Sequence, residues 1–556
     1  MAHLNLDVLR EICGFLTDVP DVLSFSLTCS TLRAAAVERR LSMRDITIWS
    51  AESIRDLYNF IFVDENRRGR HIQAITIPVH SDIPPEPSEE LINALVSVLA
   101  SATRARRFSF YFPVPDEWSA TEGSDELEVS CLFCHRKILS AVAEMVSLHE
   151  LRVVAQTDIA GYFLQSTRST LKVFWHGDVD GDSHEQFPVT VAPQLIPALQ
   201  EIALTFELFE FAMTSTPCMS LPAVRSVTLT DVFEPFKLDM LLTAFPNLDD
   251  TLIIADNLYT FNNGHLRRSR EENREAQKRY TWKALDRVAA SAVMLYALGL
   301  TCPVRHLTLN PAPVLNPRRP QATGNAGVAL RESASSRFAL LGLRLPLGNS
   351  ILGGSLFVAD TVARLTHLVL EARYMSPPGI VATPGWETDS EEEDNMSWDD
   401  ILDTLVAGVD VLRLTHIHIV VSCDVESSWG PFSTAIYDGT RHFSFDRLLT
   451  ALPNAMPSLT YIVITSSGLL CNIETNERET WRTCRAWRVR RPPVGIAESL
   501  LESHELEELS SMEGEALINK EELNGTTKAE LHRWKTVEIL SNLIVELEVE
   551  VAKGFA

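Results

Sequence analysis

A six-residue template recurs along this chain: an apolar residue, two variable residues, an apolar residue, one variable residue and a final apolar residue. The last three positions alternate as in a strand that buries one face. Eleven copies indicate repeated strand units instead of one closed domain. Clear copies begin at Ile72 (IQAITI), Leu199 (LQEIAL), Val224 (VRSVTL), Val304 (VRHLTL), Leu365 (LTHLVL), Leu414 (LTHIHI) and Leu459 (LTYIVI), and weaker copies begin at Ala105, Leu151, Leu171 and Leu248.

The segments between template copies favour helices. Residues 90–100 and 136–146 carry apolar side chains at three- and four-residue intervals, as amphipathic helices do. One segment occurs twice, as DMLLTAFPN at 239–247 and DRLLTALPN at 446–454, so we predict a unit of helix, Pro-Asn turn and strand. The copies from Leu151 to Leu248 are 20, 28, 25 and 24 residues apart, which is similar to a leucine-rich-repeat period. We therefore predict an α/β fold: an irregular αβ solenoid, in the form of a leucine-rich-repeat-like horseshoe.

Composition shifts divide the chain further. We assign residues 1–42 to a helical N-terminal unit, 43–490 to the solenoid and 491–556 to a charged helical tail, whose strongest amphipathic segment is 527–550. Insertions are predicted near 261–283, which is charged with helical propensity, and near 311–337 and 376–400. The last two are rich in Pro, Gly or acidic residues, so we interpret them as loops grafted on the repeats.

The charge balance excludes several classes of partner. The chain has 556 residues, 46% of them apolar, and 49 basic against 74 acidic side chains give a net charge of −25. Such a surface repels phosphate backbones and anionic lipid, so we expect no nucleic-acid and no membrane partner. The longest apolar run, 288–300, is too short to span a bilayer. Nine scattered cysteines suit reduced thiols, so we expect an intracellular protein of the cytoplasm or nucleus.

Motifs that carry chemistry are weak. CLFCH at 131–135 has the spacing of a haem-attachment motif or of half a zinc site, but it opens an amphipathic helix, and we interpret its thiols as structural. Asp178, Asp180 and Asp182 suggest a calcium loop, yet Ser183 and Val189 stand where Gly and Glu are needed. We find no nucleophile elbow, phosphate loop or metalloprotease helix. No catalytic residue, cofactor site or metal site is predicted.

Histidine recurs at one position of the template. His306, His367 and His416 occupy its third position in three successive clear copies, and Tyr461 occupies it in the next. His418 shares the strand face of His416, and in a leucine-rich horseshoe that face lines the concave side. If these strands are neighbours, the imidazoles stack about 5 Å apart and depress one another's pKa. We interpret these five residues as ordinary sheet-surface residues or a partner surface, with a metal role as the less favoured alternative.

The N-terminal unit has an apolar stripe on residues 4–16 and a second amphipathic helix after a turn at 18–21. A unit this small does not bury its own apolar surface, so it docks on the repeats or on another protein. The segment resembles the F-box motif, although Asn5 and Leu32 stand where Pro and Trp are usual. The matching positions are Leu4, Asp7, Leu9, Ile12, Phe15, Leu16, Leu23, Leu27 and Cys29.

Over its whole length the chain is similar to a large fungal set of F-box proteins with degenerate leucine-rich repeats. The resemblance implies that the F-box binds a Skp-type adaptor, and through it a cullin, in a cullin-RING (SCF-type) ubiquitin ligase. The repeats then bind an unknown protein substrate and position it for an enzyme that other subunits supply, so the chain itself is not an enzyme. The adaptor-binding residues implied are Leu4, Leu9, Ile12, Phe15, Leu16, Leu23 and Leu27.

Two alternatives remain open. One is a non-ligase repeat scaffold for protein–protein interaction, whose N-terminal helices cap the solenoid. The other is an enzyme that uses the histidines of the repeat strands.

Overall fold

The computed structural model describes most of the repeat strands and their connecting helices. The described residues are 6–28, 30–43, 45–63, 68–78, 88–111, 135–155, 157–177, 191–215, 220–232, 237–256, 263–310, 338–345, 365–375, 406, 412–426, 440–442, 444–472, 477–491, 504–521 and 523.

The chain forms two compact units. The first comprises Met1–Phe261 and Glu271–Asp286, and the second comprises Asn262–Arg270 and Arg287–Ala556. Each is described here by itself.

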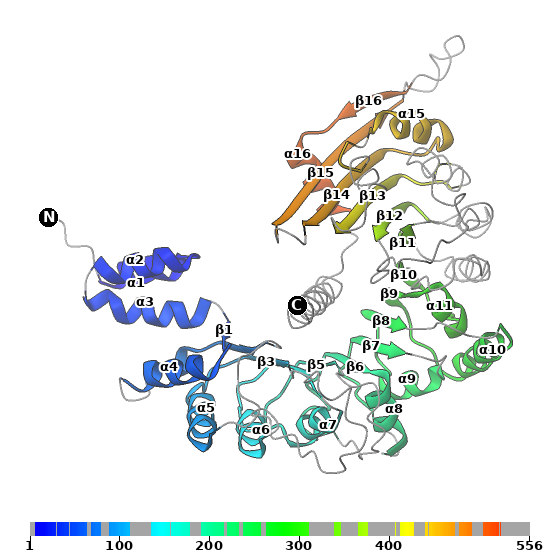
Figure 1. The fold of residues 1–556 in the computed structure, drawn as a ribbon. Coiled ribbons are helices and arrows are strands. Elements are labelled where there is room, and N and C mark those ends of the chain that lie inside the picture. The colour runs from blue at the N-terminus through cyan, green and yellow to red at the C-terminus, as the bar shows by residue number, and fades with distance from the viewer. Residues whose placement is uncertain are drawn as a thin grey trace, which may run out of the picture. The chain divides into compact units, whose positions relative to one another are not determined.

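The strands of the first unit lie side by side in chain order and pair in parallel (Figure 1). Parallel neighbours need a crossover between them, and the segments between strands provide it, most of them with a helix. The strands are β1 (Ile46–Thr47), β2 (Ala74–Ile77), β3 (Arg107–Tyr111), β4 (Glu150–Val154), β5 (Val173–Gly177), β6 (Glu201–Thr205), β7 (Ser226–Val232) and β8 (Thr251–Asp256).

One backbone hydrogen bond repeats from strand to strand at the second template position. Arg106 donates its N–H to the carbonyl of Gln73 at 2.7 Å, and His149 donates to Arg106 at 2.8 Å. The same bond joins Lys172 to His149 and Gln200 to Lys172, each at 2.8 Å. Because this position is held by backbone groups alone, its side chain is free to vary, as the template shows.

The helices of the first unit begin with an N-terminal group of three, α1 (Leu6–Phe15), α2 (Val19–Thr28) and α3 (Ser30–Met43). The others are α4 (Ala51–Phe62), η1 (Gly69–His71), α5 (Glu89–Ser101), α6 (Arg136–Ala143), α7 (Thr157–Ser166), α8 (Phe206–Ser215) and α9 (Leu238–Ala244). Serine fixes two helix starts, because Ser50 and Ser53 form a capping box on α4 and Ser88 accepts the N–H of Leu91 on α5.

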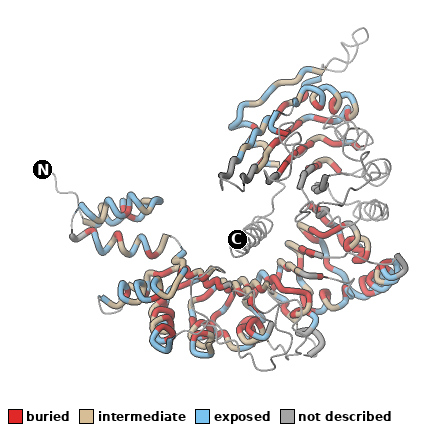
Figure 2. The backbone as a smooth tube through the Cα atoms, viewed as in Figure 1, coloured by how far each residue is buried: buried red, intermediate tan, exposed pale blue. Residues whose placement is uncertain are grey.

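The core of the first unit lies between its sheet and its helices. Buried positions alternate along β4 and β5, as a half-buried strand requires (Figure 2). Phe110 on β3 packs between Phe108 and Phe163, with ring centroids 6.0 Å from each. The sheet and the helices therefore share one continuous apolar layer, which positions the helical side of the repeats against the strands.

The second unit begins with parallel strands and ends with antiparallel ones. Strands β10 to β14 pair in parallel, whereas β15 pairs antiparallel with β14 and β16 antiparallel with β15. Its helices are α10 (Asn263–Arg279), shared with the first unit, α11 (Ala292–Leu298), α15 (Asp446–Ala455) and α16 (Ser511–Lys520). The strands are β9 (Leu285–Ser291), β10 (Val304–Asn310), β11 (Phe338–Leu345), β12 (His367–Met375), β13 (His416–Glu426), β14 (Tyr461–Asn472), β15 (Glu477–Arg490) and β16 (Glu505–Glu508).

The predicted fold class is confirmed: an α/β protein with a parallel sheet flanked by helices, an irregular solenoid like a leucine-rich repeat, with N-terminal helices. All eleven template copies fall on strands. One copy is misplaced, because the register of Arg107 with Glu150 makes Leu148, and not Leu151, its first apolar position. Among the described residues no helix is long and apolar enough to cross a membrane.

The structure adds detail at the insertions and the tail. The charged insertion near 261–283 forms α10, whereas the predicted loops at 311–327 and 376–400 lie outside the described residues. Residues 131–134 and 178–190, which hold the cysteine and aspartate motifs, also lie outside them. The described part of the tail contributes a strand, β16, as well as a helix, α16; residues 527–550 are not among those described. In the second Pro-Asn segment, 446–454, the predicted turn is part of a helix, because α15 includes Pro453.

Candidate functional site

The helices α1, α2 and α3 have a small core of their own. Cys13, Val22 and Ala36, one from each helix, are buried together. The partly buried side chains around them are Leu16, Phe25 and Met43. The guanidinium of Arg39 on α3 also donates two hydrogen bonds to the carbonyl of Leu16, at 2.7 and 3.0 Å. These bonds satisfy a carbonyl just beyond the end of α1, where no helical partner follows, and they fix α1 against α3.

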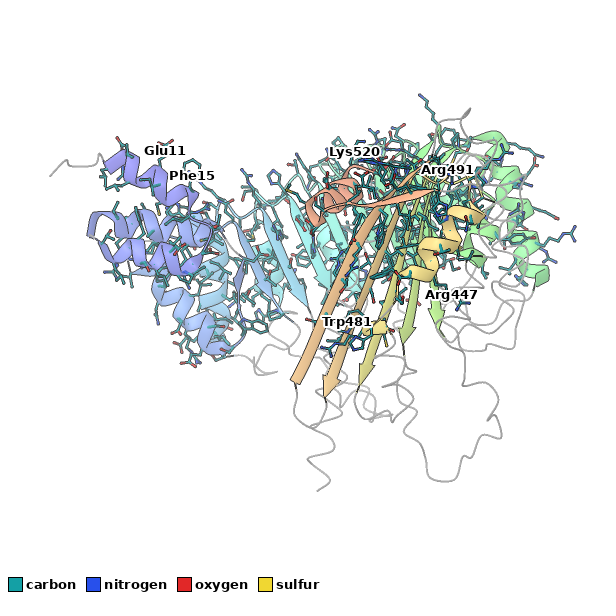
Figure 3. All side chains as sticks on the ribbon, turned by 90° about the horizontal axis from the view of Figure 1, so that it is seen from above. Glu11, Phe15, Arg447, Trp481, Arg491 and Lys520 are labelled. Carbon is teal, nitrogen blue, oxygen red and sulfur yellow. The ribbon has the colours of Figure 1, made fainter. Side chains whose placement is uncertain are left out.

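Several large apolar side chains of this unit remain exposed. On α1, Ile12 is 41% and Phe15 78% exposed, and on α2, Leu23 is 46% and Leu27 86% exposed. Figure 3 labels Phe15 on α1. Val8 adds to the stripe on α1, because 8, 12 and 15 are spaced by four and three residues. We call these five residues the apolar helix face. Exposed apolar side chains grouped on one small unit mark an interaction site more often than side chains scattered singly.

The structure divides the predicted adaptor-binding residues into three groups. Ile12, Phe15, Leu23 and Leu27 are exposed. Leu16 packs on the core of the unit and Leu9 is only partly exposed, so these two help to hold the helices. Leu4 lies outside the described residues. Val8 was not among the predicted residues, although its spacing from Ile12 and Phe15 is visible in the sequence.

The predicted histidine row is real but interrupted. His367 on β12 registers with His416 on β13, and His416 registers with Tyr461 on β14. The rings stack, with centroids 4.3 Å apart for the two histidines and 5.0 Å apart for His416 and Tyr461. His306 stands apart, because β11 lies between β10 and β12 and puts Phe338 in the intervening register position. The expectation that three imidazoles are direct neighbours therefore holds for two of them.

His418 is buried beneath the end of the described chain. Its Nδ1 lies 2.8 Å from the carbonyl oxygen of Leu523, and its Nε2 lies 2.9 Å from the hydroxyl of Thr465. Since a carbonyl only accepts, Nδ1 carries the proton of the neutral ring. Burial lowers the pKa of His418 to about 4, the Leu523 bond opposes that shift, and Arg482 adds to it. The segment that follows α16 thus occupies the strand face we assigned to a partner.

Apolar packing holds α16 over the same face. Ile518 of α16 and Leu523 are buried against Val369, Val463 and Ala486, which lie in register on β12, β14 and β15. A capping box between Ser510 and Glu513 fixes the start of this helix. The end of α16 therefore reaches the histidine row.

Glu521 faces the row from the end of α16. Its Oε2 lies 3.4 Å from Nε2 of His367, and its Oε1 lies 3.0 Å from the ammonium of Lys520. Hydrogen bonding from Lys520, together with the nearby histidines, keeps the pKa of Glu521 below its usual value against the effect of burial. Burial first, and the neighbouring His367 second, lower the pKa of His416 to about 4. The expected depression of the imidazole pKa thus has desolvation as its larger cause.

No family model matches the chain, and no curated protein is similar to it in sequence. A solved structure that resembles it is the leucine-rich repeat-containing protein LegL7 from Legionella pneumophila. The two are 11% identical, and the match covers 78% of this chain and 92% of that one with a TM-score of 0.27.

Proposed function

We propose that this chain is the substrate-recognition subunit of an SCF-type ubiquitin ligase. In this proposal α1 to α3 form an F-box that binds a Skp-type adaptor, and through it a cullin. The repeat strands and their connections bind a protein substrate. The chain contributes positioning and no catalytic residue, because a tethered substrate meets the ubiquitin-loaded enzyme at a high effective concentration.

The observation that carries the proposal is the apolar helix face. Cys13, Val22 and Ala36 already give the three helices a core, so Phe15 and Leu27 are not needed to hold the unit together. Large side chains kept in water on both α1 and α2 are explained by a partner that covers them. Ile12, Phe15, Leu23 and Leu27, four of the five residues of this face, also fall at positions where the sequence resembles the F-box motif.

A repeat scaffold without a ligase is the coarser form of the same proposal. In this form the solenoid is a protein-binding surface, and the chain binds no adaptor. The two differ in whether the apolar helix face binds a Skp-type adaptor, so a capture experiment separates them.

The experiment compares full-length variants captured from cells of the source organism, with adaptor and cullin quantified in the eluate. In the test variant, Phe15→Glu with Leu27→Glu, carboxylates replace two exposed apolar side chains. The control, Val146→Glu with Met512→Glu, makes the same change at positions 71% and 79% exposed elsewhere. We expect wild type and control to retain both proteins and the test variant to lose at least tenfold, because burying a carboxylate in an apolar interface is costly. Equal capture by all three, or capture by none, contradicts the ligase proposal.

A further inference from the structure

The two stacked histidines of the row make the same hydrogen bond through Nδ1. Nδ1 of His367 lies 2.7 Å from the hydroxyl of Thr366, and Nδ1 of His416 lies 2.9 Å from the hydroxyl of Thr415. Each ring is thus anchored by the threonine that precedes it. The arrangement leaves Nε2 of both rings to face whatever lies over the strands, and Glu521 lies there.

The hydrogen bonds fix the tautomer of His416. The hydroxyl of Thr415 donates its proton to the carbonyl of Thr366 at 3.0 Å, so it can only accept from the imidazole. Nδ1 of His416 therefore carries the ring proton, and Nε2 carries the lone pair. Anchoring one imidazole nitrogen by a hydrogen bond so that the other is left as a ligand is the usual arrangement around metal-binding histidines.

The lone pair of His416 is not used within the described part of the chain. Its Nε2 is shielded from solvent and has no hydrogen-bond partner there. A buried acceptor without a donor is costly, and such groups are rare in folded proteins. A Lewis acid at this point satisfies it.

The other two ligand atoms lie close by. One donor atom each from His367, His416 and Glu521 can be chosen so that all three lie within 4.8 Å of one another. Metal-bound nitrogen and oxygen atoms stand about 2.0 to 2.2 Å from zinc, which places neighbouring ligands roughly 3.3 to 3.6 Å apart. The Nε2 of His367 and Oε2 of Glu521 are already 3.4 Å apart. The rings are parallel to within 8°, so binding requires them to tilt. Nε2 of His367, which here donates to the Glu521 carboxylate, must also lose its proton to become a ligand.

We propose that His367, His416 and Glu521 form a binding site for a divalent transition-metal ion, with Zn²⁺ as the best match. Two imidazoles and one carboxylate suit zinc, with water in the fourth position. The ion joins β12 and β13 to the end of α16, so it fastens the C-terminal segment across the strand face that His418 and Val369 occupy. The site thereby controls how much of this face is open to a protein partner.

Two cations beside the site already have partners. Lys520 binds the second oxygen of Glu521 at 3.0 Å, which leaves Oε2 for the metal. Arg488 on β15 is the register partner of Tyr461, with its guanidinium 5.7 Å from the ring centroid, and it pairs with Glu507 at 3.1 Å.

The test uses the full-length protein after chelator treatment, titrated with CoCl₂ and with ZnCl₂. We expect one equivalent of Co²⁺ to produce the visible absorption of a low-coordinate site and Zn²⁺ to displace it. His416→Gln and Glu521→Gln should each weaken Zn²⁺ binding at least tenfold, and zinc should slow hydrogen exchange in α16 of the wild type but not in these two variants. Glu521 is partly exposed, so its variant keeps the fold. The matched control, His306→Gln, changes a histidine at the same template position and should bind as wild type does.

Two results overturn the proposal. One is the absence of Co²⁺ absorption and of Zn²⁺ binding in the wild type. The other is metal binding by His416→Gln and Glu521→Gln that is as strong as binding by the wild type, which assigns the ion to adventitious ligands. Neither result bears on the apolar helix face, because that surface lies on other residues and is tested by capture of the adaptor.

Discussion

Neighbouring residues of α1 have opposite surroundings. Cys13 is buried in the small helical core, whereas Phe15, two positions later, is mostly in water. A two-residue step turns the side chain about 200° around a helix, so the same short segment has one face in its own core and one in solvent, the face that we propose binds the adaptor. Loss of a side chain should therefore affect stability on the first face and binding on the second.

We predict that Phe15→Ser changes the free energy of unfolding by no more than about 0.5 kcal/mol, because the side chain leaves little packing behind. Val22→Ala, in the helical core, should cost about 1 to 3 kcal/mol through the cavity it creates. Denaturant unfolding of both variants measures the difference. A larger loss for Phe15→Ser than for Val22→Ala would show that Phe15 is a core residue and not a binding residue.

The contact between His71 and α3 gives a pH dependence. Nδ1 of His71 lies 3.2 Å from a carboxylate oxygen of Glu38, while Arg70 donates to Nε2 at 3.2 Å. Burial lowers the pKa of His71 most, Arg70 and Arg104 add to the lowering, and Glu38 opposes it.

A lowered pKa means that the folded protein binds fewer protons at His71 than the unfolded chain does. We therefore predict that this histidine makes stability fall as the pH drops below about 6.5, its unfolded value. His71→Gln should flatten that part of the stability profile. In Glu38→Gln, the pKa of His71 measured by NMR titration should fall further; a rise would contradict the assignment.

At the scale of elements, the template predicted the positions of many strands, but it did not always predict which strands are adjacent in the sheet. Its copies all lie on strands because burial of one face imposes the same alternation wherever the repeat occurs. Strand β9 was missed although Leu285, Val288 and Ala290 fit the template. Strand β11 was missed because Ser336 stands where its first apolar residue belongs, as the register of Phe338 with His367 shows. That omission is why His306 was expected beside His367.

The antiparallel end of the sheet was also not predicted. Strand β15 has five arginines among its 14 residues, so it resembles a charged surface segment unless its neighbours are known. The packing of α16 on β12 to β15 joins residues more than 100 positions apart, such as His418 and Leu523. Local periodicity carries no information on such contacts, and for this reason the metal site was not predicted from sequence. Four residues of the apolar helix face were predicted, since their spacing is local, and Val8 was missed.

We predict that α16 stabilises the second unit through few side chains. Ile518→Ala should lower the free energy of unfolding by about 2 to 5 kcal/mol, because Ile518 is buried in the cluster with Val369 and Val463. Met512→Ala, on the exposed side of the same helix, should change it by no more than about 0.5 kcal/mol. Chelated protein should be used for both, so that metal does not contribute. Equal effects would mean that α16 is not packed on the sheet.

At the scale of the whole molecule, each unit has a surface with a separate role. The first unit has three helices whose apolar face is unused by their own core. The second has a strand face crossed by the chain's own C-terminal segment. A net charge of −25 weakens non-specific attraction to nucleic acid or anionic lipid.

Binding of a purified Skp-type adaptor to the full-length chain, measured by isothermal titration calorimetry, tests the central claim most directly. We expect one adaptor per chain with a dissociation constant at or below about 1 µM, which corresponds to about −8 kcal/mol. Phe15→Glu with Leu27→Glu should abolish the heat of binding, and Val146→Glu with Met512→Glu should retain it. No binding by the wild-type chain, or unchanged binding by the Phe15 and Leu27 variant, would contradict the assignment of α1 to α3 as an adaptor-binding unit.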